Sequence, residues 1–411
     1  MNDSVVRFRN NAANTYDNRY KFRKRSQDLL KGEIIMNFSF HYYGTYCAAV
    51  EAGFNSDDAW VIAHAAQFVD ECSKSLLSDH GIYDKLPTYH TEAELFRLNM
   101  GWFGAPVPKE IPQVWISFHF LPGNFTEDGK FRLSYRNPKF VDDSEQTALF
   151  KLMCLPYGHM SGKIVDKAKQ MYLSNDVENT PNKKLCYIGM VMHVLADTFA
   201  HEYFVGSPSE AINECSWITE FNRSDKLKPY GLSTIRECGE KHKPKYLYSP
   251  ALSSTSVGWL GHGRAGTNPD IPNKKYYYTP NWNTGAECIK DNPLLHMCAF
   301  FQMKNAMKFI LDAEADNAFD YAKELTEDEY NSEYGSKLMN IFTSDGSETN
   351  QKKEWSQHIL DTYNQIPLEH DYKALASDNT FLDDFVNNAD EHRNMVCTHC
   401  KNITFPTLKY F

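Results

Sequence analysis

One segment of the chain is apolar on almost every side and yet carries three ionisable groups. Residues 185–206 read LCYIGMVMHVLADTFAHEYFVG, and apolar residues surround His193, Asp197 and His201. Four residues along an α-helix turn by only about 40° and rise about 6 Å, so the three groups stack along one helix face. Burying them is costly unless they are paired or bind a metal. The pattern therefore predicts a buried helix that needs a large surrounding core.

Two interpretations of this helix face remain open at this stage. In the structural interpretation, the three groups form an exposed polar stripe or a buried network in which each polar group has a partner. In the functional one, Asp197 bridges two metal ions and each ion has its own histidine, because His193 and His201 are too far apart to chelate one small ion easily. Imidazole and carboxylate ligands together favour zinc.

Further candidate ligands are scattered along the first 270 residues. His41 lies in FHY and His119 in FHF, and aromatic neighbours are unusual surroundings for an unpaired imidazole. Asp70 ends a predicted helix, where a capping role is the simpler interpretation. His159 and His262 complete the set of candidates.

The hydrophobic pattern predicts a mainly α fold. Alanine-rich helices are expected within residues 45–77, interrupted at 55–58, and further helices at 184–206, at 295–326 and in the last 60 residues. Residues 101–140 and 223–294 are expected to be loop-rich, with a strand-like piece at 114–120. Such long loops are often functional. The expected division is an N-terminal extension (1–36), a catalytic multi-helix domain around a metal cleft (37–343) and a C-terminal helical segment (344–411).

Charge and composition narrow the classes of function. The net charge of −10 disfavours generic binding to nucleic acid. No run approaches the roughly 20 apolar residues of a transmembrane segment, and the first 30 residues lack the apolar core of a signal peptide. The expected location is therefore cytosolic, or outside the cell by a route that reads no such signal. Of ten cysteines only Cys397 and Cys400 form a CxxC pair, for which chance or a structural role is the simplest interpretation.

Two apparent motifs are set aside. Residues 261–266 match GxGxxG formally, but the following TNPDIP cannot open the helix that a dinucleotide site requires. The doublet His370-Asp371 lies in a polar segment without the other spaced ligands of a phosphohydrolase. HExxH, GxSxG and Walker A sequences do not occur.

Several segments together resemble a bacterial and fungal family of zinc metallophospholipases C. The resemblance spans about residues 37–270, and the helix of His193 carries most of it. More remotely, this helix is similar to the HxxxD helix of the superfamily of zinc phospholipases C and single-strand nucleases. The matching segments are FHYYGTY (40–46), AGF (52–54), IAHAAQFVD (62–70), FHFLP (118–122), MHVLADTFAH (192–201) and GHG (261–263).

The resemblance implies two or three zinc ions and a set of ligands. They would be His41, Asp70, His119, His193, Asp197 and His201; a second downstream HxxxD pair is missing, and His262 and Asp270 are its best replacements. It implies cleavage of glycerophospholipids to diacylglycerol and a phosphorylated headgroup by metal-activated water, with Asp70 or Asp197 as base.

Expected partners are phospholipid, contacted transiently at a membrane surface, and no nucleic acid. The aromatic residues that could seat the lipid are Trp102, Phe103, Trp115, Trp259 and residues 276–278. A nuclease or other phosphodiesterase with the same metals, and a secreted effector with structural metal, are the alternatives.

Overall fold

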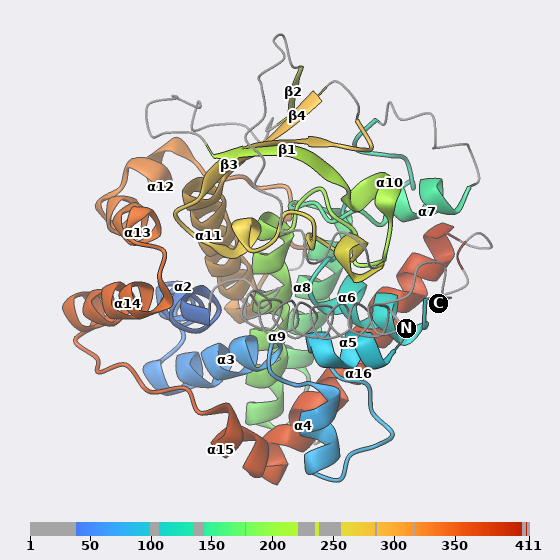
Figure 1. The fold of residues 1–411 in the computed structure, drawn as a ribbon. Coiled ribbons are helices and arrows are strands. Elements are labelled where there is room, and N and C mark those ends of the chain that lie inside the picture. Colours follow the sequence, from blue (N-terminus) through green and yellow to red (C-terminus); the bar gives the residue numbers. More distant parts are fainter. Residues whose placement is uncertain are drawn as a thin grey trace, which may run out of the picture.

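The predicted fold class is confirmed in a computed structural model of the chain. It describes residues 38–98, 107–134, 144–176, 178–220, 235–237, 256–283, 286–315, 317–404 and 408. Helices dominate these residues, and one small sheet covers one end (Figure 1). The predicted N-terminal extension and the residues Trp102 and Phe103 lie outside the described part.

Helix α9 (Pro181–Ala200) runs through the middle of the molecule (Figure 1). Its first turn is favourable for a helix, because the side chain of Thr180 accepts a hydrogen bond from the backbone of Lys183 and proline occupies the first position. Every residue from Leu185 to Ala200 is buried. The predicted central helix is thus confirmed, although it ends at Ala200 rather than at residue 206.

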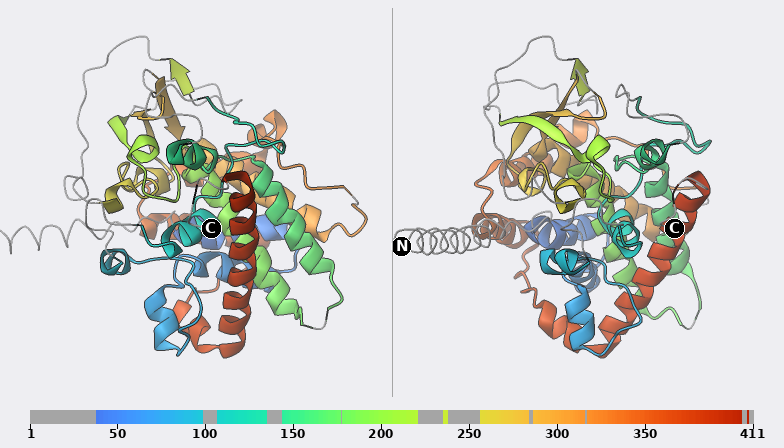
Figure 2. Two further views of the ribbon diagram at one scale, coloured as in Figure 1. Left: turned by 90° about the vertical axis from the view of Figure 1, so that its right-hand side faces the viewer. Right: turned by 45° about the vertical axis from the view of Figure 1, so that its right-hand side comes forward.

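Six helices pack against α9 and lie on different sides of it, as the turned views also show (Figure 2). They are α2 (Thr45–Ala52), α3 (Ser56–Phe68), α6 (Glu110–Phe118), α8 (His159–Leu173), α11 (Asn292–Leu311) and α16 (Asn379–Thr404). Asn55 caps α3 through its side chain, at the interruption that the sequence predicted. Helices α3 and α9 cross closely at Gly189, where a Cβ atom would lie 2.2 Å from the carbonyl oxygen of Ile62.

The prediction of a strand-like piece at residues 114–120 is wrong. Residues 110–118 form α6, with Pro112 in its first turn, where no intrahelical amide partner is needed. A short apolar run without clear periodicity suits a buried helix as well as a strand. Here the run is mostly apolar because α6 packs against both α9 and α16.

A four-stranded antiparallel sheet has three of its strands in the region expected to be loop-rich, residues 223–294. Its order is β1-β3-β4-β2, from β1 (Cys215–Glu220), β2 (Ile235–Glu237), β3 (Lys275–Pro280) and β4 (Ala286–Asp291). Burial alternates along β3, with Tyr276 and Tyr278 facing the core. Six residues of alternation between turn-rich neighbours are a weak signal, which explains why the sequence did not predict the sheet.

The other helices flank this core. They are η1 (Phe40–Gly44), α4 (Lys74–Asp79), α5 (Glu92–Arg97), α7 (Glu145–Lys151), α10 (Glu210–Asn213), η2 (Ser256–Trp259), η3 (Asn268–Asp270), α12 (Glu327–Asn331), α13 (Glu333–Thr343), α14 (Glu348–Tyr363) and α15 (Tyr372–Ser377). The predicted break near residue 344 separates α13 from α14, and the helical character of the following segment is confirmed as far as Thr404. Among the described helices, none has the length and apolar character of a membrane span.

Candidate metal centre

Five of the predicted ligands converge beside α9 in a first group, which consists of two triads that share His193: His41 with His193 and Asp197, and Asp70 with His119 and His193. His41 comes from η1, Asp70 follows α3, and His119 follows α6, while His193 and Asp197 come from α9 itself. All five side chains are buried. The helix packing around α9 therefore brings four segments, distributed between positions 41 and 197 of the chain, to one point, as the resemblance implied.

The distances within the first group suit a metal ion. Asp197 lies at its centre, with its Oδ1 3.2 Å from Nε2 of His41, and its Oδ2 3.1 Å from Nδ1 of His119 and 3.4 Å from Nε2 of His193. Oδ1 of Asp70 is 3.6 Å from the same nitrogen of His193. Two atoms that bind one ion tetrahedrally at about 2.1 Å lie about 3.4 Å apart. The group therefore has the spacing of a ligand set.

A second group consists of His201, His262 and Asp270. His201 follows the last residue of α9, His262 lies in a turn after η2, and Asp270 ends η3. Oδ1 of Asp270 is 3.3 Å from Nε2 of His201 and 3.5 Å from Nε2 of His262. The predicted ligand His262 and its proposed companion Asp270 are thus brought together with His201.

Hydrogen bonds to backbone carbonyls orient three of these imidazoles. His119 donates from Nε2 to the carbonyl of Thr88 (3.0 Å), His201 from Nδ1 to the carbonyl of His119 (2.7 Å), and His262 from Nδ1 to the carbonyl of Gly266 (2.9 Å). A carbonyl can only accept, so these nitrogens carry the hydrogen, and the other nitrogen of the neutral ring offers a lone pair to the group. Ligand histidines in metalloproteins are held in this way.

Burial keeps His193, His201 and His262 in the neutral form that binds metal. It lowers the pKa of His193 to about 3 and also lowers the pKa of His201 and of His262. Burial alone would raise the pKa of the Asp197 carboxyl, but the imidazoles of His201 and His193 hold this pKa well below its usual range. The Asp197 carboxylate is thus ionised among imidazole nitrogens, an arrangement that a cation would stabilise.

A cation would also stabilise the atoms of the second group. Burial raises the pKa of Asp270 to about 7, because the loss of water outweighs the attraction of the nearby His262 imidazole. Oδ2 of Asp270 and Nε2 of His262 are buried and have no hydrogen-bond partner among the described residues. Buried polar atoms rarely lack a partner, and a bound cation would supply one to both atoms. Both groups therefore have the composition and geometry to hold a metal ion.

The division of ligands differs from the prediction in one respect. Asp197 was expected to bridge an ion at His193 and an ion at His201. Oδ2 of Asp197 is 3.5 Å from Nδ1 of His201, but that nitrogen donates to the carbonyl of His119 and cannot also bind a metal. The available Nε2 of His201 faces Asp270 instead. His201 belongs to the second group because its Nδ1 is occupied by the carbonyl of His119 and only its Nε2, beside Asp270, remains for a metal.

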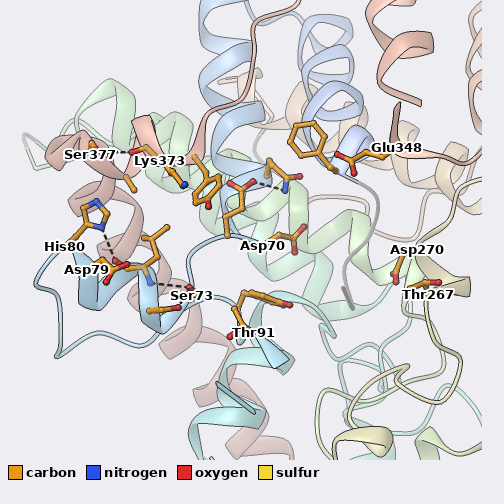
Figure 3. A pocket seen from close by; sticks show the side chains of 18 of the residues that line it. Asp70, Ser73, Asp79, His80, Thr91, Thr267, Asp270, Glu348, Lys373 and Ser377 are labelled. Carbon is orange, nitrogen blue, oxygen red and sulfur yellow. Dashed lines mark hydrogen bonds between the residues drawn. The ribbon is translucent and has the colours of Figure 1, made fainter. Parts of the chain in front are cut away.

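One pocket of about 940 Å³ opens onto a carboxylate of each group, Asp70 and Asp270. In Figure 3, Asp70 lies between the α15 residues Lys373 and Ser377 on one side and Thr267 with Asp270 on the other. Carboxylates outnumber cationic side chains in the lining. The lining residues are Phe38, Gln67, Asp70, Glu71, Ser73, Ser75, Leu76, Asp79, His80, Tyr89, Thr91, Thr267, Asp270, Ile271, Gly346, Glu348, Tyr372, Lys373, Ala376 and Ser377.

The aromatic residues expected to seat a lipid lie elsewhere, as far as the structure describes them. Trp115 packs against His119 in the core, Trp259 donates to Glu214, and Tyr276 and Tyr278 are buried in β3. They and Tyr277 are absent from the pocket lining, whose aromatic members are Phe38, Tyr89 and Tyr372. Aromatic residues fill cores more often than they line sites, and only the tertiary structure separates the two uses.

Three other sequence candidates lie outside both groups. His159 begins α8 and contacts Phe125 and Tyr321. His370 pairs with Glu71, the residue after Asp70, and with His64. Cys397 and Cys400 lie on α16 as free thiols.

A buried ion pair that no sequence pattern signalled supports the end of α9. Lys290, on β4, donates to the carbonyls of Phe199 and Ala200 at 3.1 and 3.2 Å, and its Nζ is 3.1 Å from the carboxylate of Glu202. The lysine is fully buried. Its positive charge is favourable beside the last carbonyls of a helix, so it fixes the turn that carries His201.

Comparison with known proteins places the chain in a family. Comparisons with curated proteins and with solved structures yield no match. A family model described as a family of unknown function, DUF6765, matches residues 36–405, which include both of the predicted segments 37–343 and 344–411 almost entirely. Since this match covers most of the 411 residues, the chain belongs to the DUF6765 family.

Proposed function

We propose that this protein is a metal-dependent phosphodiester hydrolase, and specifically a zinc phospholipase C that acts on glycerophospholipids. The observation that carries the proposal is the pocket that reaches both ligand groups through Asp70 and Asp270. Two neighbouring metal sites open to one pocket suit the attack of water on a phosphodiester. The lipid specificity rests on the resemblance of residues 37–270 to metallophospholipases C.

Electrostatics explain why such a substrate would require the metals. The pocket lining contains Asp70, Glu71, Asp79, Asp270 and Glu348 and a single lysine, Lys373. Without bound cations this lining repels a phosphate. Divalent ions reverse the local field, hold phosphodiester oxygens and lower the pKa of bound water to about 7.

The two proposed catalytic aspartates differ in what they contact. Asp197 lies within 3.5 Å of four imidazole nitrogens and is almost completely buried, which suits a role that holds the ligand set together. Asp70 belongs to the same group but also lines the pocket. Asp70 is therefore the better candidate to accept a proton from an attacking water, while Asp197 positions the imidazoles.

The main alternative is a nuclease with the same metals. A nuclease needs cationic side chains along its nucleic-acid track, because most of the affinity comes from phosphate contacts. The net charge of −10 and the acidic pocket lining disfavour this function. A structural metal in a non-enzymatic effector is also less favoured, because both groups border a pocket large enough for a small substrate.

The test is hydrolysis of defined phospholipids by the purified, zinc-loaded protein. Phosphatidylcholine and phosphatidylglycerol are supplied, and diacylglycerol and phosphorylated headgroup are measured. EDTA is expected to abolish the activity and added zinc to restore it. Asp70→Asn and Asp270→Asn should each lower the rate at least about a hundredfold. Asp79→Asn is the matched control, because Asp79 lines the same pocket but belongs to neither ligand group.

Three results would contradict the proposal. Cleavage of single-stranded nucleic acid without cleavage of lipid would establish the nuclease alternative. Firmly bound metal without hydrolysis of any phosphodiester would indicate a structural role for the ions. Absence of metal after expression with added zinc would remove the basis of both enzymatic functions.

A further inference from the structure

Exposed apolar side chains gather in one short segment near the pocket. The described residues include six large hydrophobic side chains that are exposed, and four of them lie between the last turn of α14 and the first residue of α15. These four are Leu360, Ile366, Leu368 and Tyr372, and Ile366 is the most exposed of all, at 81%. We name residues 360–372 the apolar loop.

The fold holds this loop in its exposed position. Asn364 ends α14 in the left-handed conformation with φ of 54°. The hydroxyl of Tyr42 donates to the carbonyl of Leu368 at 3.2 Å, and His370 bonds Glu71 at 2.7 Å and His64 at 2.8 Å. Exposure of Ile366 is therefore a property of the folded chain, since anchors on the protein body fix the segment that carries it.

The same loop borders the pocket. Tyr372 belongs to the loop and to the pocket lining, and the lining continues along α15 through Lys373, Ala376 and Ser377 (Figure 3). On the body side, the anchor Glu71 follows the candidate ligand Asp70 directly in the chain. A surface that receives the apolar loop would thus lie beside the entrance to both ligand groups.

We propose that the apolar loop inserts into the surface of a zwitterionic phospholipid bilayer and brings the pocket to its substrate. The inference rests on the proposed lipid hydrolysis. Exposed apolar side chains that adjoin a polar pocket are typical of membrane-contacting enzymes, and insertion removes them from water. The neighbouring charges are Asp361, Glu369 and Asp371 against Lys373, so an anionic bilayer would repel the loop.

A second copy of the chain fits this loop less well. A stable dimer buries about 800 Å² on each partner, which is more than four side chains on one segment supply. The loop offers Ile366 as its most exposed side chain, whereas a protein partner usually meets a broader surface. A fluid lipid surface adapts to a small apolar projection.

The test measures binding to phosphatidylcholine vesicles by sedimentation, with the full chain as purified. Wild type is expected to bind, and the double variant Ile366→Asp with Leu368→Asp should bind at least about tenfold more weakly, because two apolar contacts are lost and two charges are added. Ile366→Leu should keep wild-type binding. Leu173→Asp is the matched control, because Leu173 is an exposed leucine on α8, outside the apolar loop.

Parallel measurements separate this inference from the proposed function. A short-chain phosphatidylcholine below its micellar concentration should be hydrolysed at the wild-type rate by all loop variants. If neither wild type nor the variants hydrolyse this substrate, the proposed function fails, while vesicle binding still tests the role of the loop. Absence of wild-type binding, equal binding by the double variant, or an equal loss in Leu173→Asp would overturn the inference. So would a wild-type dimer, seen by light scattering, that the double variant dissociates.

Discussion

Replacing Asp197 by asparagine tests the organisation of the first ligand group. The substitution keeps size and shape and removes the charge that lies within 3.5 Å of four imidazole nitrogens. Asparagine supplies one neutral oxygen and cannot offset the charge of a divalent ion. We expect affinity for the metal, and with it the rate of lipid hydrolysis, to fall at least about a hundredfold, which is about 2.7 kcal/mol.

The same loss should appear in thermal stability. Metal in excess stabilises the folded state according to its dissociation constant, so hundredfold weaker binding removes about 2.7 kcal/mol. An unfolding entropy of about 2.1 cal/mol/K per residue gives about 0.9 kcal/mol/K for 411 residues. The zinc-dependent rise of the melting temperature should therefore be about 3 °C smaller in the variant.

The assay compares melting temperatures with zinc and with EDTA for wild type, Asp197→Asn and the control Asp79→Asn. In EDTA the difference between wild type and Asp197→Asn should shrink, because the buried carboxylate then has no ion to bind. Asp79→Asn should show the full zinc effect. An unchanged zinc effect in Asp197→Asn, together with a near-normal rate of hydrolysis, would refute the assignment of this residue to the metal.

Three further predictions concern the protein around the site. Lys290→Met leaves Glu202 buried without its partner and should lower the free energy of unfolding in urea by about 3–5 kcal/mol. The additional substitution Glu202→Gln should recover part of this loss. Equal stability of the single variant and wild type would contradict the role of the pair. Burial lowers the pKa of His392 to about 4. The unfolded chain therefore binds more protons than the folded one between about pH 6.5 and 4, and the free energy of unfolding falls as the pH drops through this window. In urea unfolding with EDTA, His392→Gln should flatten this slope by up to about 1.36 kcal/mol per pH unit. Gly189→Ala would place a Cβ atom 2.2 Å from the carbonyl oxygen of Ile62, and urea unfolding should show a loss of more than about 2 kcal/mol, unless the helices α3 and α9 can separate at little cost.

The sequence predicted those features that depend on local pattern. Helix α9 combines an apolar composition with a strong N-terminal cap, and its stacked His193 and Asp197 follow from helix geometry alone. The second ligand group depends on a turn after η2 that returns His262 and Asp270 to the end of α9, more than 60 residues away along the chain. No local pattern encodes that return. Similarly, no sequence pattern distinguishes Lys290 from an exposed lysine, and only the tertiary structure shows that it is fully buried.

His119 connects the two ligand groups through a single residue. Its side chain belongs to the first group, while its backbone carbonyl holds the ring of His201 in the second group at 2.7 Å. An ion that fixes the imidazole of His119 also fixes this carbonyl, so less freedom remains to be lost when the second ion binds. Occupancy of either group should then raise the affinity of the other by the same factor, as thermodynamic reciprocity requires. Zinc titration of the metal-free protein should consequently follow a cooperative curve rather than the sum of two independent sites.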